Sequence, residues 1–177
     1  MNARPLTDDV VTLRRWTEDD ADAIVECLDG DPEISRWLDR VPQPYTRGDA
    51  LAYVRGEIPP GGRDEFAITD AATGRVIGSI GASPTEDGTR EIGYWVRADA
   101  RGRGVSSRAV RLVLGWAFED ADVMRVQLRA DPENRASCRV AEKCSFIFEG
   151  VLRRAHWNPR IGERRDWAIY SVLRRGI

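Results

Sequence analysis

One strand-loop-helix stretch, residues 94–107, constrains the fold of this chain more than any other. It begins as an apolar run at 94–96 and continues through a loop at 97–104. Arginine and glycine alternate at the end of this loop, over residues 101–104. Apolar residues then recur at three- and four-residue spacing, which predicts a helix: Val105, Ala109, Val113 and Ala117, with Leu112 and Trp116 beside them. A strand must therefore lead directly into the start of an amphipathic helix.

This junction has the properties of an anion site. The first N–H groups of a helix lack partners within the helix, and the helix dipole adds partial positive charge there. Glycine lets a phosphate approach the backbone closely. Against one acid, Asp99, five arginines surround the loop: Arg97, Arg101, Arg103, Arg108 and Arg111. We therefore expect a diphosphate to bind here. The alternative is that Gly102 and Gly104 only shape a tight turn.

Two common phosphate-binding loops are excluded. No Gly-Lys-Ser/Thr follows the glycines, so the loop is not a Walker loop. The third glycine of a dinucleotide fingerprint is missing, and no early strand-turn-helix unit precedes it.

Motifs in the second half of the chain resemble one family. Arg101-Gly102-Arg103-Gly104-Val105-Ser106 resembles the Arg/Gln-x-x-Gly-x-Gly/Ala acyl-CoA signature of the GNAT N-acetyltransferases, with Ser106 in the place of Gly or Ala. Residues 131–137 and 141–146 resemble the family's Asn-x-x-Ser…Glu-Lys-x-Gly-Phe block, with Ser145 where Gly is usual, and residues 149–153 match the strand that follows. In this order, the set is most similar to the branch of the ribosomal-protein N-terminal acetyltransferases (RimJ/RimL type). The resemblance covers nearly the whole chain.

The resemblance implies an α/β (α+β) fold. We expect a mixed, mostly antiparallel sheet of six to seven strands flanked by helices, with a splayed cofactor cleft between the strand at 91–97 and the strand at 123–129. It also implies acetyl-CoA, or another acyl-CoA, as co-substrate. The residues expected to bind it are Trp95, Val96, Arg97, Arg101, Gly102, Arg103, Gly104, Val105, Ser106, Ser107, Asn134 and Ser137.

The pattern along the rest of the chain predicts the elements of such a sheet. A first strand at 10–14 precedes three helices that begin after Thr17, Asp31 and Thr46. Pro59-Pro60-Gly61-Gly62 ends the third helix as a turn too short for a domain linker, so we expect one domain over residues 1–177. The remaining strands are predicted at 66–68, 76–80, 91–96, 123–129, 146–148 and 167–172, and a further helix at 134–143. This order predicts helices on the faces of a mixed sheet.

Composition restricts the class of protein. The apolar fraction of 42% and charged fraction of 32% are typical of a globular protein. We expect no membrane span, no secretion signal and, with a net charge of −2, no nucleic-acid partner. Cys27, Cys138, Cys144 and the single His156 have no metal-ligand spacing, so we expect no metal and reduced thiols in the cytoplasm. A homodimer is left open.

Acyl transfer to an amine requires an acceptor for the amine proton, a donor to the oxyanion, and a proton for the leaving thiolate. Glu91 is the candidate base. By strand alternation it shares a face with Gly93 and Trp95, and in the family an acid on this strand often serves as base. The alternative is a solvated glutamate at the start of a strand.

Ser137 is the candidate for helping the thiolate to leave. In the branch that the chain resembles, a serine here lies near the cofactor sulfur. Many family members use a tyrosine in this region, whereas no tyrosine lies between Tyr94 and Tyr170 here. The resemblance also implies that Asn134 contacts the pantetheine arm, although it is equally suited to cap the helix. Cys138 and Cys144 are not favoured as nucleophiles, because no histidine lies near them in the sequence.

The first fifty residues hold twelve acids against six arginines. In the family, the helices of this region form one wall of the acceptor site, where Asp31 and Glu33 would attract a cationic amine; the alternative is a solvated acidic surface. The expected activity is transfer of an acyl group from acyl-CoA to the primary amine of a protein N-terminus or a small molecule, by direct attack in a ternary complex. The alternative from another class is a non-catalytic regulatory module that binds acyl-CoA.

Overall fold

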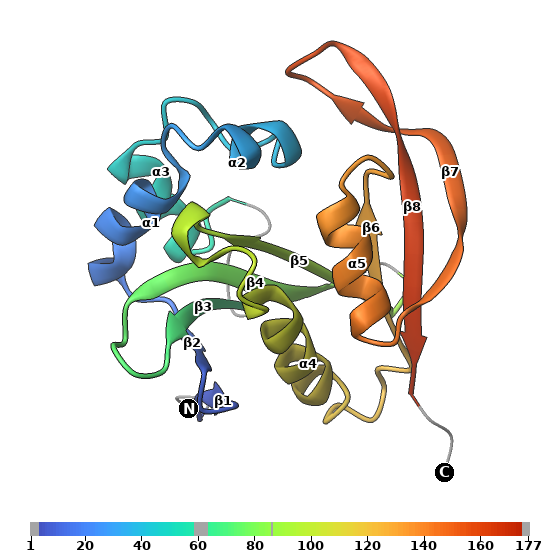
Figure 1. Ribbon diagram of the computed structural model, residues 1–177, viewed down its shortest axis with the longest axis horizontal. Helices are drawn as coiled ribbons and strands as arrows, with labels where there is room; N and C mark the ends of the chain where they lie inside the picture. Colours follow the sequence, from blue (N-terminus) through green and yellow to red (C-terminus); the bar gives the residue numbers. More distant parts are fainter. Residues whose placement is uncertain (1–3, 59–63, 86, 175–177) are drawn as a thin grey trace.

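The structure is a computed structural model that describes residues 4–58, 64–85 and 87–174. Eight strands form one sheet in the order β1-β2-β3-β4-β5-β6-β8-β7 (Figure 1). The strands are β1 (Leu6–Thr7), β2 (Val11–Arg15), β3 (Glu65–Asp70), β4 (Val76–Pro84), β5 (Arg90–Val96), β6 (Arg125–Ala130), β7 (Ile147–Asn158) and β8 (Glu163–Leu173). The helices are α1 (Ala21–Leu28), α2 (Pro32–Trp37), α3 (Arg47–Val54), α4 (Val105–Ala117) and α5 (Arg135–Lys143).

The sheet is mixed and mostly antiparallel, as predicted. Only β5 and β6 pair in parallel, and the other neighbouring strands are antiparallel. The number of strands was predicted one or two too low, and β1 is the strand that the pattern did not predict. Its two residues pair with Thr12 and Leu13 of β2, a segment too short to show any periodicity.

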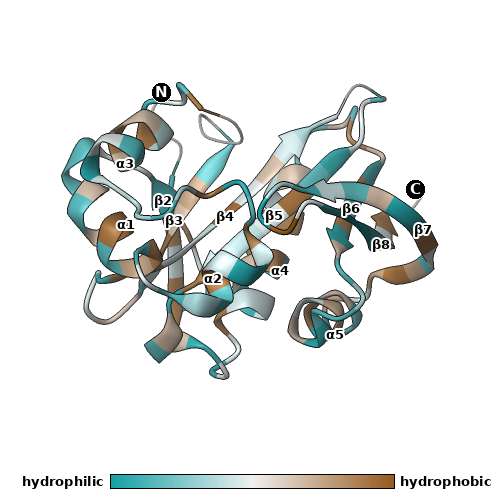
Figure 2. Cartoon of the chain, turned by 90° about the horizontal axis from the view of Figure 1, so that it is seen from above, coloured by the Kyte–Doolittle hydropathy of each residue, from teal (hydrophilic) through white to brown (hydrophobic). Residues whose placement is uncertain are grey.

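Helices cover both faces of the sheet, which Figure 2 shows from above. On one face, α1 and α3 bury Ala21, Ile24 and Ala50 against Trp95 of β5. On the other face, α4 packs on the sheet through the stripe that the sequence predicted. Its buried residues include Val105, Ala109, Val110, Val113 and Ala117. Burying each of its valines stabilises the fold by roughly 1.5–3 kcal/mol.

The second and third helices begin where their capping residues predicted, and the first begins one turn later. Asp31 accepts hydrogen bonds from the backbone N–H groups of Glu33 and Ile34, and Thr46 forms a capping box with Asp49. Thr17 caps a single 3-10 turn, Glu18–Asp20, which leads into α1. The predicted turn at 59–62 lies outside the described residues.

The last two strands are much longer than the sequence predicted. β7 and β8 form a hairpin that extends beyond the sheet (Figure 1). β7 is largely exposed, and β8 begins with the exposed residues Glu163 and Arg164, so apolar alternation does not mark the outer part of the hairpin.

Candidate active site

The cleft lies where two parallel strands separate. β5 and β6 pair only from Arg90 to Ile92 and from Val126 to Leu128, although both strands continue. Beyond Ile92, therefore, no strand in the described part of the chain pairs with the edge of β5 at 93–96 on its β6 side, while β4 pairs with its other side. This is the splayed cleft that the resemblance predicted. Its volume is about 450 Å³, and residues 93–96, α2 and the starts of α4 and α5 line it.

The glycine loop lies at one end of the cleft. Gly102 and Gly104 have φ angles of 73° and 79°, and Gly104 is the residue at which α4 begins. These left-handed conformations are why glycine is required at both positions. No described residue accepts a hydrogen bond from the N–H groups of Gly102, Arg103 or Gly104, and the first N–H groups of α4 are free by position. The backbone thus presents a row of donors to the cleft.

Most of the arginines near the loop already have partners. Arg101 donates to the carbonyl of Val96 at 2.9 Å and to Asp31 at 2.5 Å. Arg97 forms an ion pair with Asp99, and Arg108 forms one with Asp8. Arg111 donates a hydrogen bond to the carbonyl of Lys143. Arg103 is exposed, and no other described residue bonds to it. The candidate anion site therefore consists mainly of backbone N–H groups, and Arg101 joins the loop to Val96 and Asp31.

Two hydroxyl groups meet in the wall of the cleft. The hydroxyls of Tyr94, on β5, and Ser137, in the first turn of α5, are hydrogen-bonded at 3.0 Å. Burial raises the pKa of Tyr94 to about 12, so its phenol stays protonated at neutral pH. Asn134 caps α5 by accepting the backbone N–H of Ser137. All three residues line the cleft.

Glu91 lies at the edge of this arrangement. Its carboxylate accepts a hydrogen bond from Gln127 at 2.9 Å and forms an ion pair with Arg129 at 2.5 Å, both on β6. Among the described residues that line the cleft, Arg129 is present and Glu91 is not. The structure therefore places the predicted base beside the cleft, in an ion pair with one of its lining residues.

The two acids proposed for the acceptor wall have local partners as well. Asp31 caps α2 and binds Arg101, while Glu33 is exposed and accepts a bond from the Trp37 indole. Both acids therefore already have partners in or next to α2.

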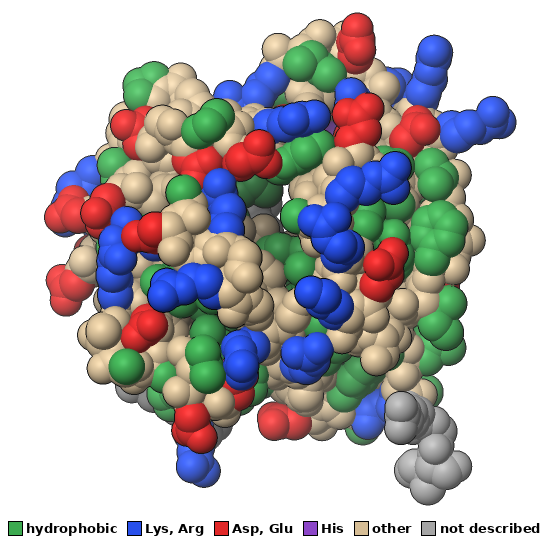
Figure 3. Space-filling view, in the orientation of Figure 1, with side chains coloured by type: hydrophobic (Ala, Val, Ile, Leu, Met, Phe, Trp, Pro, Cys, Tyr) green, Lys and Arg blue, Asp and Glu red, His purple; other side chains and the backbone are tan. Residues whose placement is uncertain are grey.

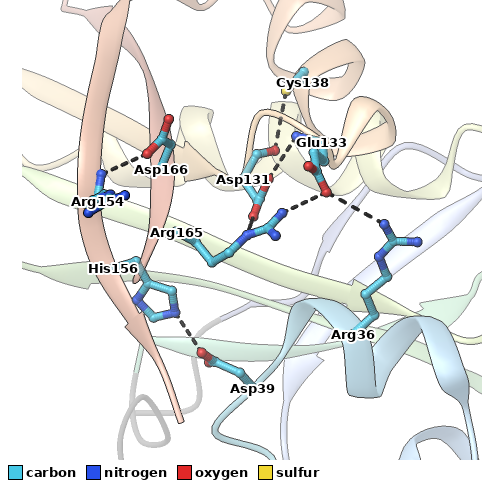
Figure 4. Close-up of polar contacts among 9 residues, drawn as sticks. All are labelled: Arg36, Asp39, Asp131, Glu133, Cys138, Arg154, His156, Arg165 and Asp166. Atoms are coloured by element: carbon cyan, nitrogen blue, oxygen red, sulfur yellow. Dashed lines mark hydrogen bonds and ion pairs between the residues drawn. The ribbon is translucent and has the colours of Figure 1, made fainter. Parts of the chain in front are cut away.

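Ion pairs connect the α2 region with the β7–β8 hairpin across the cleft (Figure 4). Asp39 accepts a bond from Nε2 of His156 at 2.7 Å. Glu133 binds both Arg36 and Arg165, and Arg165 also binds Asp131. Figure 3 shows the molecule hollowed between these two sides, with basic side chains gathered around the opening.

Sequence reasoning missed three polar residues of the cleft. Tyr94 was expected in the core, and His156 was considered only as a metal ligand; Asp39 was not considered. Alternation along β5 does place Tyr94 with Ile92 and Val96, toward α4 and α5, and that signal could have found it. No local pattern pairs Asp39 with His156, which lies 117 positions further along the chain.

The thiols are buried away from the cleft. Cys27, Cys138 and Cys144 are free and buried, and none of them is among the described lining residues. Burial raises the pKa of the Cys144 thiol, which donates to the carbonyl of Ser107. Within the described ranges, no group of three or more His, Cys, Asp or Glu side chains could hold a metal ion. No described helix is long and apolar enough to cross a membrane.

Comparison with known proteins gives a consistent result. The family described as "Acetyltransferase (GNAT) domain" matches residues 11–147. The chain is 28% identical to "Uncharacterized N-acetyltransferase p20" of Bacillus licheniformis over 169 residues, 93% of each chain. It is also 28% identical to "Putative ribosomal N-acetyltransferase YdaF" of Bacillus subtilis (strain 168), over 93% of this chain and 92% of that one.

A solved structure has the same fold. The acetyltransferase (GNAT family) from Bacillus anthracis aligns with a TM-score of 0.84 at 21% identity, covering 96% of this chain and 98% of that one. The expected fold class is therefore confirmed.

Proposed function

The chain belongs to the GNAT acetyltransferase family, and we propose that its cleft acetylates the N-terminal amine of a protein. Membership of the family makes it an acyl-CoA-dependent N-acetyltransferase with acetyl-CoA as co-substrate. The resemblance to the ribosomal-protein branch is confirmed by the similarity to YdaF. The acceptor, the residues that act and the course of the reaction are our proposals.

The separation of β5 from β6 carries the proposal for cofactor binding. The free edge at 93–96 offers backbone N–H and C=O groups along which the amides of a pantetheine arm fit. At one end, the N–H groups from Gly102 to Ser107 are suited to the diphosphate. Arg139 and Lys143 of α5 also line the cleft and add positive charge for phosphate.

We propose that the amine attacks the thioester directly. A covalent acyl-enzyme would need a reactive thiol in the cleft, whereas the cysteines are buried outside it. The hydroxyl pair of Tyr94 and Ser137 is the proposed proton source for the departing thiolate. Burial keeps the phenol of Tyr94 protonated, so the phenol can donate a proton at the pH at which the amine reacts.

The printed name of YdaF supports a ribosomal protein as the acceptor. Acetyl-CoA and ribosomal proteins meet in the cytoplasm, where we place the reaction. A small amine, such as a polyamine or an aminoglycoside, is the alternative that the experiment must separate.

The test is release of CoA thiol from acetyl-CoA with a panel of amines. The panel contains peptides with N-terminal serine or alanine, their N-formylated counterparts, spermidine and kanamycin. We expect turnover with a free N-terminal peptide and none with its blocked counterpart. Turnover with a small amine and with no peptide would contradict the proposed protein acceptor and favour a small-molecule acceptor. Tight acetyl-CoA binding without turnover would favour a regulatory module.

A further inference from the structure

We propose that His156, oriented by Asp39, accepts the proton of the attacking amine. This inference rests on the proposed acetyl transfer and assigns a residue to its first step. His156 lines the cleft from β7, and Asp39 follows α2 on the opposite side. Their side chains are 16% and 8% exposed.

The contacts fix the imidazole in one orientation. Its Nε2 lies 2.7 Å from Oδ2 of Asp39, and its ring stacks on Trp167 of β8, with centroids 4.6 Å apart and planes 13° apart. An ionised carboxylate can only accept a hydrogen bond, so in the neutral ring that we propose Nε2 carries the proton and Nδ1 keeps its lone pair. A neutral imidazole held in this way is ready to take a proton.

The guanidinium groups near the ring are paired with carboxylates. From β6, Arg129 lies over the same Trp167 ring at 4.0 Å, but it is paired with Glu91. From β8, Arg165 is the strand partner of His156, and it binds Asp131 and Glu133. On the α2 side, Arg36 also approaches Glu133. Each guanidinium near the ring thus has a carboxylate partner, and Asp39 is the carboxylate that bonds to the imidazole.

The carboxylates near the cleft are less suited to the task. The acids among its described lining residues are Glu33 and Asp131. Asp131 is bound to Arg165, and Glu33 is exposed on the outer turn of α2. Glu91 lies outside the lining and is bound by Arg129 and Gln127. His156 is the lining side chain that combines burial, a fixed ring and a free acceptor atom.

The protons and electrons balance as follows. The acceptor arrives as an ammonium ion, and Nδ1 of His156 takes one proton, directly or through one water. The freed electron pair forms the C–N bond at the thioester carbonyl carbon while the C=O π pair moves onto oxygen, which gives a tetrahedral intermediate. When that pair returns to the carbon and restores the C=O bond, the C–S electron pair leaves on sulfur. As the intermediate collapses, the Tyr94–Ser137 pair gives a proton to sulfur. The nitrogen loses its second proton, which replaces the proton that the pair has given. His156 releases the first proton to solvent.

Because His156 is the only histidine in the chain, its ring can be observed without assignment. Nitrogen NMR of the untagged, ¹⁵N-labelled protein at alkaline pH should show one protonated and one bare ring nitrogen. Coupling to the ring carbons should identify the bare atom as Nδ1. In Asp39→Asn this preference should weaken. A bare Nε2 in the wild type would overturn the proposal, whether or not an acceptor has been found.

Kinetics test the role itself, with the serine peptide or the small amine that the wild type acetylates. His156→Gln should lower the rate at neutral pH by about a hundredfold, and the loss should shrink at high pH, where the amine is already neutral. Asp39→Asn should show a smaller loss of the same kind. Added imidazole should partly restore His156→Ala. Affinity for acetyl-CoA, measured by calorimetry, should not change.

Arg160→Ala is the matched control, because Arg160 also joins the hairpin to the α2 side, through the carbonyl of Val41, but does not line the cleft. It should keep the wild-type pH–rate profile. Equal losses of rate in Arg160→Ala and His156→Gln, independent of pH and without rescue by imidazole, would overturn the proposal. His156 would then only hold the two sides of the cleft together. If the wild type releases no CoA with any amine, the proposed function fails separately, and the NMR result still decides the state of the ring.

Discussion

The hydroxyl oxygens of Tyr94 and Ser137 lie 3.0 Å apart, so that β5 and α5 meet through a hydrogen bond in the wall of the cleft. Their sequence separation is 43 positions, and they are joined at the level where the two parallel strands separate. A proton can pass along such a pair, and our proposal is that it serves as a relay to the departing thiolate.

Ser137→Ala tests this relay with little structural disturbance. Asn134 caps α5 through the backbone N–H of Ser137, so alanine keeps the cap and removes only the hydroxyl. We expect kcat to fall by roughly ten- to a thousandfold, within the range of proton-transfer aids. Pre-steady-state assays should confirm that chemistry limits the rate; a wild-type kcat under those conditions would remove Ser137 from the mechanism.

Tyr94→Phe should produce a loss of similar size, and the double variant should lose little more than either single one. Residues that act through one hydrogen bond are non-additive in this way. The cycle is measured as kcat with saturating substrates. Strictly additive losses would mean that the two hydroxyls act independently. Tyr53→Phe is the control for loss of a buried hydroxyl, since Tyr53 bonds to Glu65 and Ser79 away from the cleft.

Gly104→Asp tests the anion site. At φ 79° an aspartate is strained, and its charge would lie beside the N–H groups assigned to the diphosphate. We expect affinity for CoA to fall at least about tenfold, or ~1.4 kcal/mol. Gly88→Asp is the matched control, because Gly88 has the same φ in the turn between β4 and β5. Calorimetry on both folded variants separates the effect of charge from that of strain; equal CoA affinities in the two would contradict the assignment.

Local patterns predicted the parts of the site that a single stretch of chain forms. The spacing of Val105, Ala109 and Val113 predicted α4, and the glycines indicated a phosphate loop or a tight turn at its start, where the structure has left-handed φ angles. The same stretch placed a donor-rich loop next to β5. These features depend on backbone geometry and on burial of one helix face, which neighbouring residues determine.

Contacts between distant segments could not be predicted in this way. Arg101, which lines the cleft and was expected to bind the cofactor, also binds Asp31 at a separation of 70 positions and so joins the loop to the start of α2. His156 reaches Asp39 only because the β7–β8 hairpin extends past the sheet. Nothing near either residue in the sequence encodes its partner, since the fold as a whole brings them together.

Asp31 should contribute to stability through both of its oxygens. Oδ1 accepts the N–H groups of Glu33 and Ile34, and Oδ2 accepts Arg101. Asp31→Ala loses the cap, worth about 1 kcal/mol, and leaves Arg101 without its carboxylate, so we expect a loss of about 2 kcal/mol in the free energy of unfolding. Asp31→Asn keeps a capping oxygen and should lose less. Urea denaturation measures both, and equal losses would show that the ion pair dominates over the cap.

A buried carboxyl group beneath α3 should make the stability of the protein depend on pH. Glu65 is 5% exposed and accepts a hydrogen bond from the Tyr53 hydroxyl at 3.0 Å. It lies against Gly81 of β4, where a Cβ atom would collide with its carboxyl group. Burial raises the pKa of Glu65 to about 8, so the folded protein holds a proton here that the unfolded chain releases near pH ~4.3.

The sign of the effect follows from this difference. Between pH ~4.3 and about 8 the folded state binds one proton more than the unfolded state, so its stability falls as the pH rises through that window. Glu65→Gln resembles the protonated acid and should remove this dependence. Wild type and variant should unfold at similar temperatures near pH ~4, and the variant should become more stable by a few kcal/mol at alkaline pH, since one pKa unit is worth about 1.4 kcal/mol. Calorimetric melting curves across the range measure the difference, with the exposed Glu119→Gln as control. A constant difference between Glu65→Gln and wild type at every pH would mean that Glu65 is already ionised in the folded protein.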